Sequence, residues 1–230
     1  MPCIIHIETS TKVCSVALSK SKEILFNREN YDGSSHAELL GVYVYETLQF
    51  AKQKGLKLEA VSVSSGPGSY TGLRIGVSEA KGLCYGLNIP LISLPTLDIM
   101  AHQVIQSGME ADFYCSMIDA RRMEVYAAIY DKHLNRVKDI SSDIIDENSY
   151  SEFISKGKIC FFGDGAGKCQ NIIPVTEEVT FIEELHPLAS GMIFLAKEKY
   201  ERKEFVDVAY FEPFYLKEFK ATISKNKVIY

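Results

Sequence analysis

The architecture of this chain is set by the segment PCIIHIETSTKVCSVALSKSKEILFNRENY, residues 2–31. It contains three runs rich in apolar and β-branched residues, separated by the polar turns 10–12 and 20–22. Short runs of this kind, joined by tight turns, predict a meander of three antiparallel strands. The strands are expected at Pro2–Thr9, Val13–Leu18 and Glu23–Tyr31.

Helices and strands alternate after this meander. Apolar residues at helical spacing and a capping box formed by Ser35 and Glu38 predict a first helix, which ends near Gly55. The order βββαβαβα is typical of a ribonuclease-H-like lobe with a mixed sheet. The elements expected after the first helix are a strand at 60–64, a helix at 73–87, a strand at 89–93 and a helix that Thr96 caps and that runs to about 105.

The second half of the chain repeats this order in a shorter form. It contains strand patterns at 113–118, 124–130, 136–145 and 158–163, a capping box at Ser149 and Glu152, and a helical pattern at 188–200. We therefore expect an α/β protein with a duplicated ribonuclease-H-like, actin-like (ASKHA) fold, in which two lobes have mixed sheets flanked by helices. The N-terminal lobe is expected at 1–108 and the smaller C-terminal lobe at 109–230, with a tail that could return to the N-terminal lobe.

Composition excludes several classes of protein. The chain has 230 residues and a net charge of −5, from 25 basic and 30 acidic residues. This balance argues against a protein that holds nucleic acid alone, because such binding needs a basic face. The six cysteines form no CxxC pair, and they predict buried free thiols in a reducing cytoplasm. No run approaches the roughly twenty apolar residues of a membrane span, so a soluble cytoplasmic protein is expected.

Motifs for catalysis and for metal binding are missing from the sequence. No two of the five histidines have the spacing of a helical metal pair. No GxSxG motif supplies a nucleophile. The sequence therefore predicts no catalytic residue and no metal ligand.

A glycine-rich turn, SSGPGSYTGLRIG at residues 64–76, joins a predicted strand to a predicted helix. A turn of this kind can hold an anion at the helix N-terminus. However, it lacks the Lys-Ser/Thr of a P-loop, its spacing is GxGxxxG, and Pro67 removes one amide donor. A tight structural connection is favoured here over phosphate binding.

The helix after this turn carries small residues every four positions, in two neighbouring strips: Gly72, Gly76 and Ala80, and Ser78, Gly82 and Gly86. Glycine costs about 1 kcal/mol per helix position relative to alanine, so a close contact must offset the cost. Two strips suggest that one packs on the sheet of its own lobe and the other on a second chain. Tight internal packing alone is the alternative.

Polar residues at two predicted strand ends are candidates for nucleotide contacts. In actin-like folds the corresponding turns face the phosphates of a nucleotide that lies between the lobes. An acidic residue at the first turn could also organise a metal ion through water. The alternative is that these are ordinary polar strand ends. The candidates are Glu8, Thr9, Ser10, Gly163 and Asp164.

Two further segments are basic. The turn Asp119–Arg122 holds two adjacent arginines, which could reach a phosphate or a carboxylate of a partner, although a solvated turn is the simpler interpretation. The tail from Lys217 to Lys227 holds four lysines and one glutamate. This tail could lie near RNA or be a solvated end.

Together these segments resemble the TsaB (YeaZ) family, whose members are partners of the enzyme TsaD in threonylcarbamoyladenosine (t6A) modification of tRNA. The most specific motif is GPGSYTGLRIGVS at 66–78. The resemblance is dense over 4–100 and 119–130 and sparse elsewhere. The other motifs are IETST at 7–11, CSVAL at 14–18, HAELL at 36–40, EAKGL at 79–83 and DARRMEVY at 119–126.

The resemblance implies a non-catalytic accessory subunit that pairs with TsaD, which transfers threonylcarbamoyl to adenosine 37 of tRNA. It also implies that the ATPase TsaE joins the complex, that tRNA is met indirectly, and that no membrane is involved. The chain itself would need no cofactor, and ATP or ADP could lie at the partner interface. One departure is Glu8, where most TsaB sequences carry aspartate. The alternatives are an actin-like ATP-binding phosphotransferase or ATPase and a residual glycoprotease-type peptidase.

The pairing surface that the resemblance implies lies on the first two helices of the first lobe. The same surface is expected to form a homodimer when the chain is alone. The residues carried over to this surface are His36, Leu39, Leu40, Tyr43, Gly72, Leu73, Gly76, Val77 and Ala80.

Overall fold

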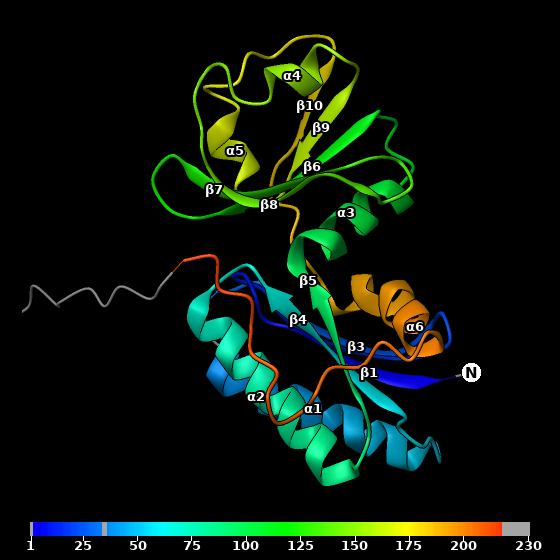
Figure 1. Cartoon of the computed structure of the whole chain (residues 1–230). Helices are drawn as coiled ribbons and strands as arrows, with labels where there is room; N and C mark the ends of the chain where they lie inside the picture. Colours follow the sequence, from blue (N-terminus) through cyan, green and yellow to red (C-terminus); the bar gives the residue numbers. More distant parts are fainter. Residues whose placement is uncertain (1, 34–35, 218–230) are drawn as a thin grey trace, which may run out of the picture.

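Each half of the chain forms a five-stranded mixed sheet in the computed structural model, which describes residues 2–33 and 36–217 (Figure 1). The strand order is β3-β2-β1-β4-β5 in the first sheet and β8-β7-β6-β9-β10 in the second. In both sheets the first three strands are antiparallel and the last two pair in parallel. This topology confirms the α/β class and the duplicated ribonuclease-H-like, actin-like arrangement.

The first lobe contains the longer helices. Its strands are β1 (Cys3–Glu8), β2 (Cys14–Lys20), β3 (Glu23–Asn30), β4 (Ala60–Gly66) and β5 (Leu91–Pro95). Its helices are α1 (His36–Gln53), α2 (Tyr70–Leu87) and α3 (Thr96–Gln106).

The second lobe keeps the strands and shortens the helices. Its strands are β6 (Phe113–Asp119), β7 (Glu124–Tyr130), β8 (Arg136–Ile144), β9 (Ile159–Phe162) and β10 (Val179–Ile182). Its helices are α4 (Ser151–Ile154) and α5 (Ala166–Cys169), followed by the 3₁₀ turn η1 (Ala189–Met192) and α6 (Ile193–Glu201).

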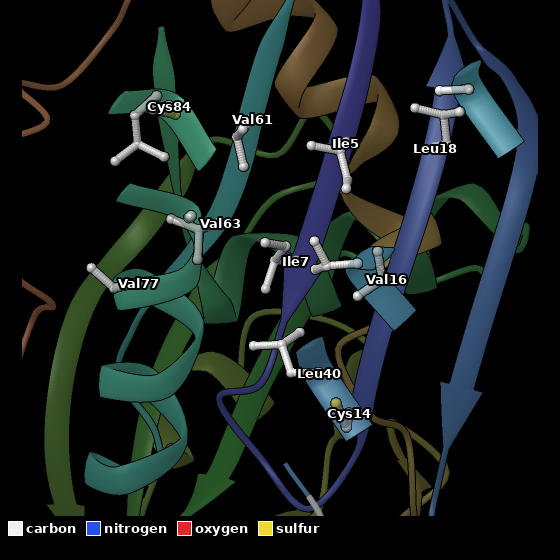
Figure 2. Close-up of a cluster of buried hydrophobic side chains, with 14 of the residues drawn as sticks. Ile5, Ile7, Cys14, Val16, Leu18, Leu40, Val61, Val63, Val77 and Cys84 are labelled. Carbon is white, nitrogen blue, oxygen red and sulfur yellow. The ribbon is translucent and has the colours of Figure 1, made fainter. Parts of the chain in front are cut away.

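The main core of the first lobe lies between its sheet and the pair α1–α2 (Figure 2). Side chains alternate across a strand, so Ile5 and Ile7 of β1 both point toward the helices, next to Val61 and Val63 of β4. Leu40 of α1 enters the same cluster. All six cysteines are free and buried, which confirms the prediction of buried free thiols.

The end of the described chain returns to the first lobe. Ala189, Met192 and Ala196 of η1 and α6 pack into a core with Ile4 and Ala17 of the first sheet. Residues 205–217, which we call the C-terminal strap, then run beside α2 (Figure 1). The C-terminal lobe was expected at 109–230 with a tail that could return to the N-terminal lobe, and the structure shows this return from Ala189 onward.

Several predicted boundaries are wrong. Helix α2 begins at Tyr70, because the side chain of Ser69 accepts the amide N–H of Gly72 and caps the helix earlier than its apolar pattern indicates. No second capping box forms, since Ser149 bonds to Asp146 instead. Ser35 of the first box lies outside the described residues. Strand β10 and helix α5 were not predicted.

Within 2–33 and 36–217, no helix is long and apolar enough to span a bilayer.

Candidate functional site

Helices α1 and α2 lie side by side on one face of the first sheet, and they form the outer layer of the first lobe (Figure 1). Their inner faces are buried: Leu40, Val44, Thr47 and Ala51 on α1, and Gly72, Leu73, Gly76, Val77, Ala80 and Cys84 on α2. The predicted partner-binding residues thus come together on two adjacent helices.

The first strip of small residues faces inward. A Cβ atom on Gly72 would clash with the carbonyl oxygen of Thr9, and one on Gly76 would clash with the hydroxyl of the same threonine. Ala80 is fully buried. The assignment of this strip to a partner is corrected accordingly: glycine is needed because α2 approaches β1 too closely for a side chain.

The other residues that were predicted to bind a partner differ in how deeply they are buried. Leu40, Leu73 and Val77 are buried in the lobe, and they position the helices instead of meeting a partner. His36, Leu39 and Tyr43 are half-buried at the edge of this core, where part of each side chain is reachable from outside.

The second strip faces outward. A Cβ atom on Gly82 or Gly86 would meet no atom within 4 Å. Beside this strip the side chain of Tyr85 is 87% exposed, and on α1 Val42 is 49% exposed and Tyr45 61% exposed. We call the exposed set Gly41, Val42, Tyr45, Ser78, Gly82 and Tyr85 the α1–α2 face.

The prediction had missed the aromatic members of the α1–α2 face. Val42 and Tyr45 stand three positions apart on α1, so they share a helix face, and this spacing could have signalled them. Exposed tyrosines beside glycines suit a protein contact, since aromatic residues are enriched in interfaces and small residues allow close approach.

The turn after β1 is closed by the glycine-rich turn. The amide of Ser69 donates to the carbonyl of Ser10 at 2.7 Å, and a Cβ atom on Gly68 would clash with that carbonyl. Thr9 donates its hydroxyl hydrogen to the carbonyl of Gly72 at 2.8 Å. The turn after β1, which could have faced a phosphate, is therefore covered by the backbone of the glycine-rich turn. This packing agrees with the prediction that the glycine-rich turn is a tight structural connection.

Glu8 is completely buried beneath this turn. Its Oε1 accepts the amide N–H of Ser10 at 2.5 Å, and its Oε2 has no hydrogen-bond partner in the described part of the chain. Burial raises the pKa of the Glu8 carboxyl, and the hydrogen bonds from the turn only partly oppose that shift. Burial therefore shifts this carboxyl toward its neutral form relative to an exposed glutamate.

The candidates of the second lobe lie at the seam between the lobes. Gly163 has φ +111°, and a side chain there would clash with the carbonyl of Met117. Asp164 accepts the amide N–H of Asp119 at 2.9 Å, and burial raises its pKa, while His186 and Lys12 oppose the shift. Lys12 belongs to the first lobe, so both predicted turns do approach this seam.

These five residues do not form a cradle for a nucleotide. Thr9, Ser10 and Glu8 are fully buried, and Gly163 packs against backbone. The backbone and side-chain groups of Thr9, Ser10 and Asp164 make hydrogen bonds to neighbouring parts of the chain. The buried positions of Glu8, Thr9 and Ser10 do not fit direct contact with nucleotide phosphates.

Comparison with known proteins places the chain among proteins of tRNA modification. The family model of TsaD, tRNA N6-adenosine threonylcarbamoyltransferase, matches residues 30–225. A protein of Escherichia coli named tRNA threonylcarbamoyladenosine biosynthesis protein TsaB is 28% identical over 224 residues, which cover 93% of this chain and 94% of that protein. The TsaB protein of Buchnera aphidicola from Acyrthosiphon pisum is also 28% identical, over 85% of this chain and 90% of its own length.

A solved structure has the same fold. The structure of YeaZ from Pseudomonas aeruginosa superposes with a TM-score of 0.75 at 24% identity, over 94% of this chain and all of that one.

Proposed function

Because this chain belongs to the TsaD family and is a TsaB (YeaZ) member of it, we propose that it serves t6A biosynthesis as a non-catalytic accessory subunit. Its place in t6A biosynthesis follows from the relatives that it matches over most of its length. The finer proposal is that it pairs with TsaD, that TsaE joins this pair, and that the chain reaches tRNA only within such an assembly.

The observation that carries the proposal is the α1–α2 face. On α2, Tyr85 is 87% exposed near Gly82, which has open space around it, and on the neighbouring α1 Tyr45 is 61% exposed. Tyrosine rings buried at the centre of an interface often dominate its binding energy. The face is therefore suited to a helix pair of a related fold, either TsaD or a second copy of this chain.

The position of Glu8 supports the non-catalytic part of the proposal. In this chain the acidic residue at the end of the first strand is buried and partly unpaired, instead of being exposed toward a cleft. An actin-like phosphotransferase would need that carboxylate near a metal ion and the phosphates. Nothing in the described site favours the phosphotransferase or the peptidase alternative over the accessory role.

The test is binding of purified TsaD by variants of the α1–α2 face. Gly82→Arg places a long charged side chain on the face, and Tyr45→Ala with Tyr85→Ala removes its exposed rings. Ile144→Ala is the matched control, because this side chain is 78% exposed on the second lobe. We expect the face variants to bind TsaD at least tenfold more weakly at unchanged thermal stability, and the control to bind normally.

A second measurement tests the role. Formation of t6A is reconstituted from TsaC, TsaD, TsaE and tRNA, with and without this chain. We expect modification only when the chain is present, and a reduced rate with Gly82→Arg. Normal TsaD binding by folded face variants would contradict the surface, and full modification without the chain would contradict the role.

A further inference from the structure

The turn between β6 and β7 holds two arginines in an unfavourable backbone conformation. Arg121 has φ +70° and Arg122 has φ +51°. The turn is closed by the amide of Glu124, which donates to the carbonyl of Arg121 at 3.3 Å. Left-handed positions favour glycine or asparagine, and strain of this kind is most often found at functional sites. The backbone conformation of the two arginines therefore lowers the stability of this turn.

The carboxylates around this turn are already paired with lysines. Lys168 contacts Asp119 and donates to the carbonyl of Arg122 at 2.8 Å, and Lys217 of the C-terminal strap contacts Glu124. Arg121 and Arg122 are both exposed. No carboxylate among the described residues forms an ion pair with either guanidinium, so the turn presents uncompensated positive charge.

Aromatic rings lie beside these cations. The ammonium of Lys217 is 5.8 Å from the centre of the Tyr126 ring. Two residues earlier, Tyr215 packs on Tyr70 with ring centres 4.9 Å apart, and the Arg74 guanidinium lies 5.5 Å from the Tyr70 ring.

The C-terminal strap links these two groups. Figure 1 shows the β6–β7 turn and the end of the strap on the same side of the molecule. We call Arg121, Arg122, Lys217, Tyr126, Tyr215 and Arg74 the hairpin–strap patch. It joins the tip of the second lobe to the N-terminal end of α2.

We propose that the hairpin–strap patch contacts the RNA substrate, with Arg121 and Arg122 on backbone phosphates and the Tyr215 ring, which is 37% exposed, available for base stacking. This inference rests on the proposed function, since it assumes that tRNA is brought to the complex by the partner enzyme. Arginine forms paired hydrogen bonds with phosphate oxygens, and exposed rings beside cations are the usual surface for single-stranded nucleic acid.

The acidic composition of the whole chain is compatible with this contact. The net charge of −5 excludes this chain as the main holder of RNA, whereas two unpaired guanidiniums supply a local contact. The tail beyond Lys217, which carries the other lysines named above, lies outside the described residues.

The test combines stability with RNA binding. The variant Arg121→Asn/Arg122→Gly keeps the turn length and places residues in it that tolerate positive φ. The control Lys20→Gln/Lys22→Gln removes two exposed charges near the other hairpin turn, where Ser21 has φ +60°. An unmodified tRNA transcript is titrated with the chain alone at low salt, and with the TsaD complex at several salt concentrations.

We expect the arginine variant to melt higher by about 2–4 °C, because strain is removed from the turn. We also expect it to bind the transcript about tenfold more weakly. Its salt dependence should lose about 0.7–0.9 in logarithmic slope for each phosphate contact removed. The lysine control should bind the transcript like the unchanged chain.

Two outcomes overturn the inference. One is unchanged transcript binding by the arginine variant, in the chain alone and in the complex. The other is weaker binding of TsaD with unchanged transcript binding, which would assign the arginines to a protein contact. Failure of the proposed function is distinguishable, because the unchanged chain would then fail to bind TsaD or to support t6A formation.

Discussion

The hydroxyl of Thr9 donates a hydrogen bond of 2.8 Å to the carbonyl of Gly72, which ties the end of β1 to the first turn of α2. One helical turn later, Gly76 faces the same hydroxyl with no room for a side chain. This contact fixes the orientation of α2 on the sheet. The orientation in turn determines which face of α2 is exposed and could meet a partner.

The two strips of small residues on α2 should respond to substitution with opposite signs. Gly76→Ala inserts a methyl group against Thr9, and overpacking of this kind costs about 1–3 kcal/mol of stability. Gly82→Ala adds its methyl group in open space and should stabilise the helix by about 0.5–1 kcal/mol. Urea denaturation of both variants checks this, and equal effects at the two positions would contradict the assigned faces.

Lys81 should hold the C-terminal strap on α2. Its ammonium donates to the carbonyls of Ala209 at 2.9 Å and Phe211 at 3.1 Å. Lys81→Met removes both hydrogen bonds, and we expect a loss of about 1–3 kcal/mol together with faster proteolytic cleavage within the strap. Limited proteolysis and denaturation measure the two effects.

The control for the strap is Lys156→Met, since Lys156 makes an exposed ion pair with Glu152, four residues earlier in the chain. Pairs of this kind contribute little to stability, because solvent screens both charges. If Lys81→Met is cleaved no faster than this control, the strap is held by other contacts.

Glu8 should make stability depend on pH. Burial raises its pKa in the folded state, so its contribution is fully present below the unfolded value of about 4.3. That contribution is lost as the pH rises from there through the raised folded value. Glu8→Gln removes this loss, so the variant should gain stability relative to the unchanged chain as the pH rises. A difference that stays constant from pH 4 to 8 in denaturation experiments would show that the carboxyl does not titrate as expected.

The isolated chain should not bind ATP with magnesium. Thr9 and Ser10 are buried against the glycine turn, and the Glu8 carboxyl is buried beneath it. Calorimetry should therefore give no saturable heat with the chain alone. Saturable binding followed by hydrolysis would instead support the phosphotransferase alternative and overturn the accessory role.

The sequence predicted the fold better than it predicted the site. Alternating apolar residues in β1 and β2 and the repeat of that meander after residue 112 were enough to indicate two similar sheets. The N-terminal boundary of α2 was missed because it depends on a single hydrogen bond from Gly72 to Ser69, which a hydrophobic pattern does not record.

The residues that were predicted to meet a partner on α2 include the strip of small residues that faces the sheet. Glycines at 72 and 76 and at 82 and 86 have the same spacing, so periodicity cannot tell which pair faces the sheet. The choice depends on the position of Thr9, which is distant in sequence. The exposed rings of Tyr45 and Tyr85 were missed for the same reason, because their exposure depends on how both helices sit on the sheet.

The sequence by itself determined the duplicated fold and the family, because strand patterns, turn residues and the motif at 66–78 are local properties of the chain. Only the tertiary structure decided which residues of α6 and the strap pack on the first lobe, that Glu8 is buried, and that Arg121 lies near Lys217 and Tyr126. Each of these results from contacts between residues far apart in sequence. Such contacts are set by the packing of whole elements, which no local pattern records.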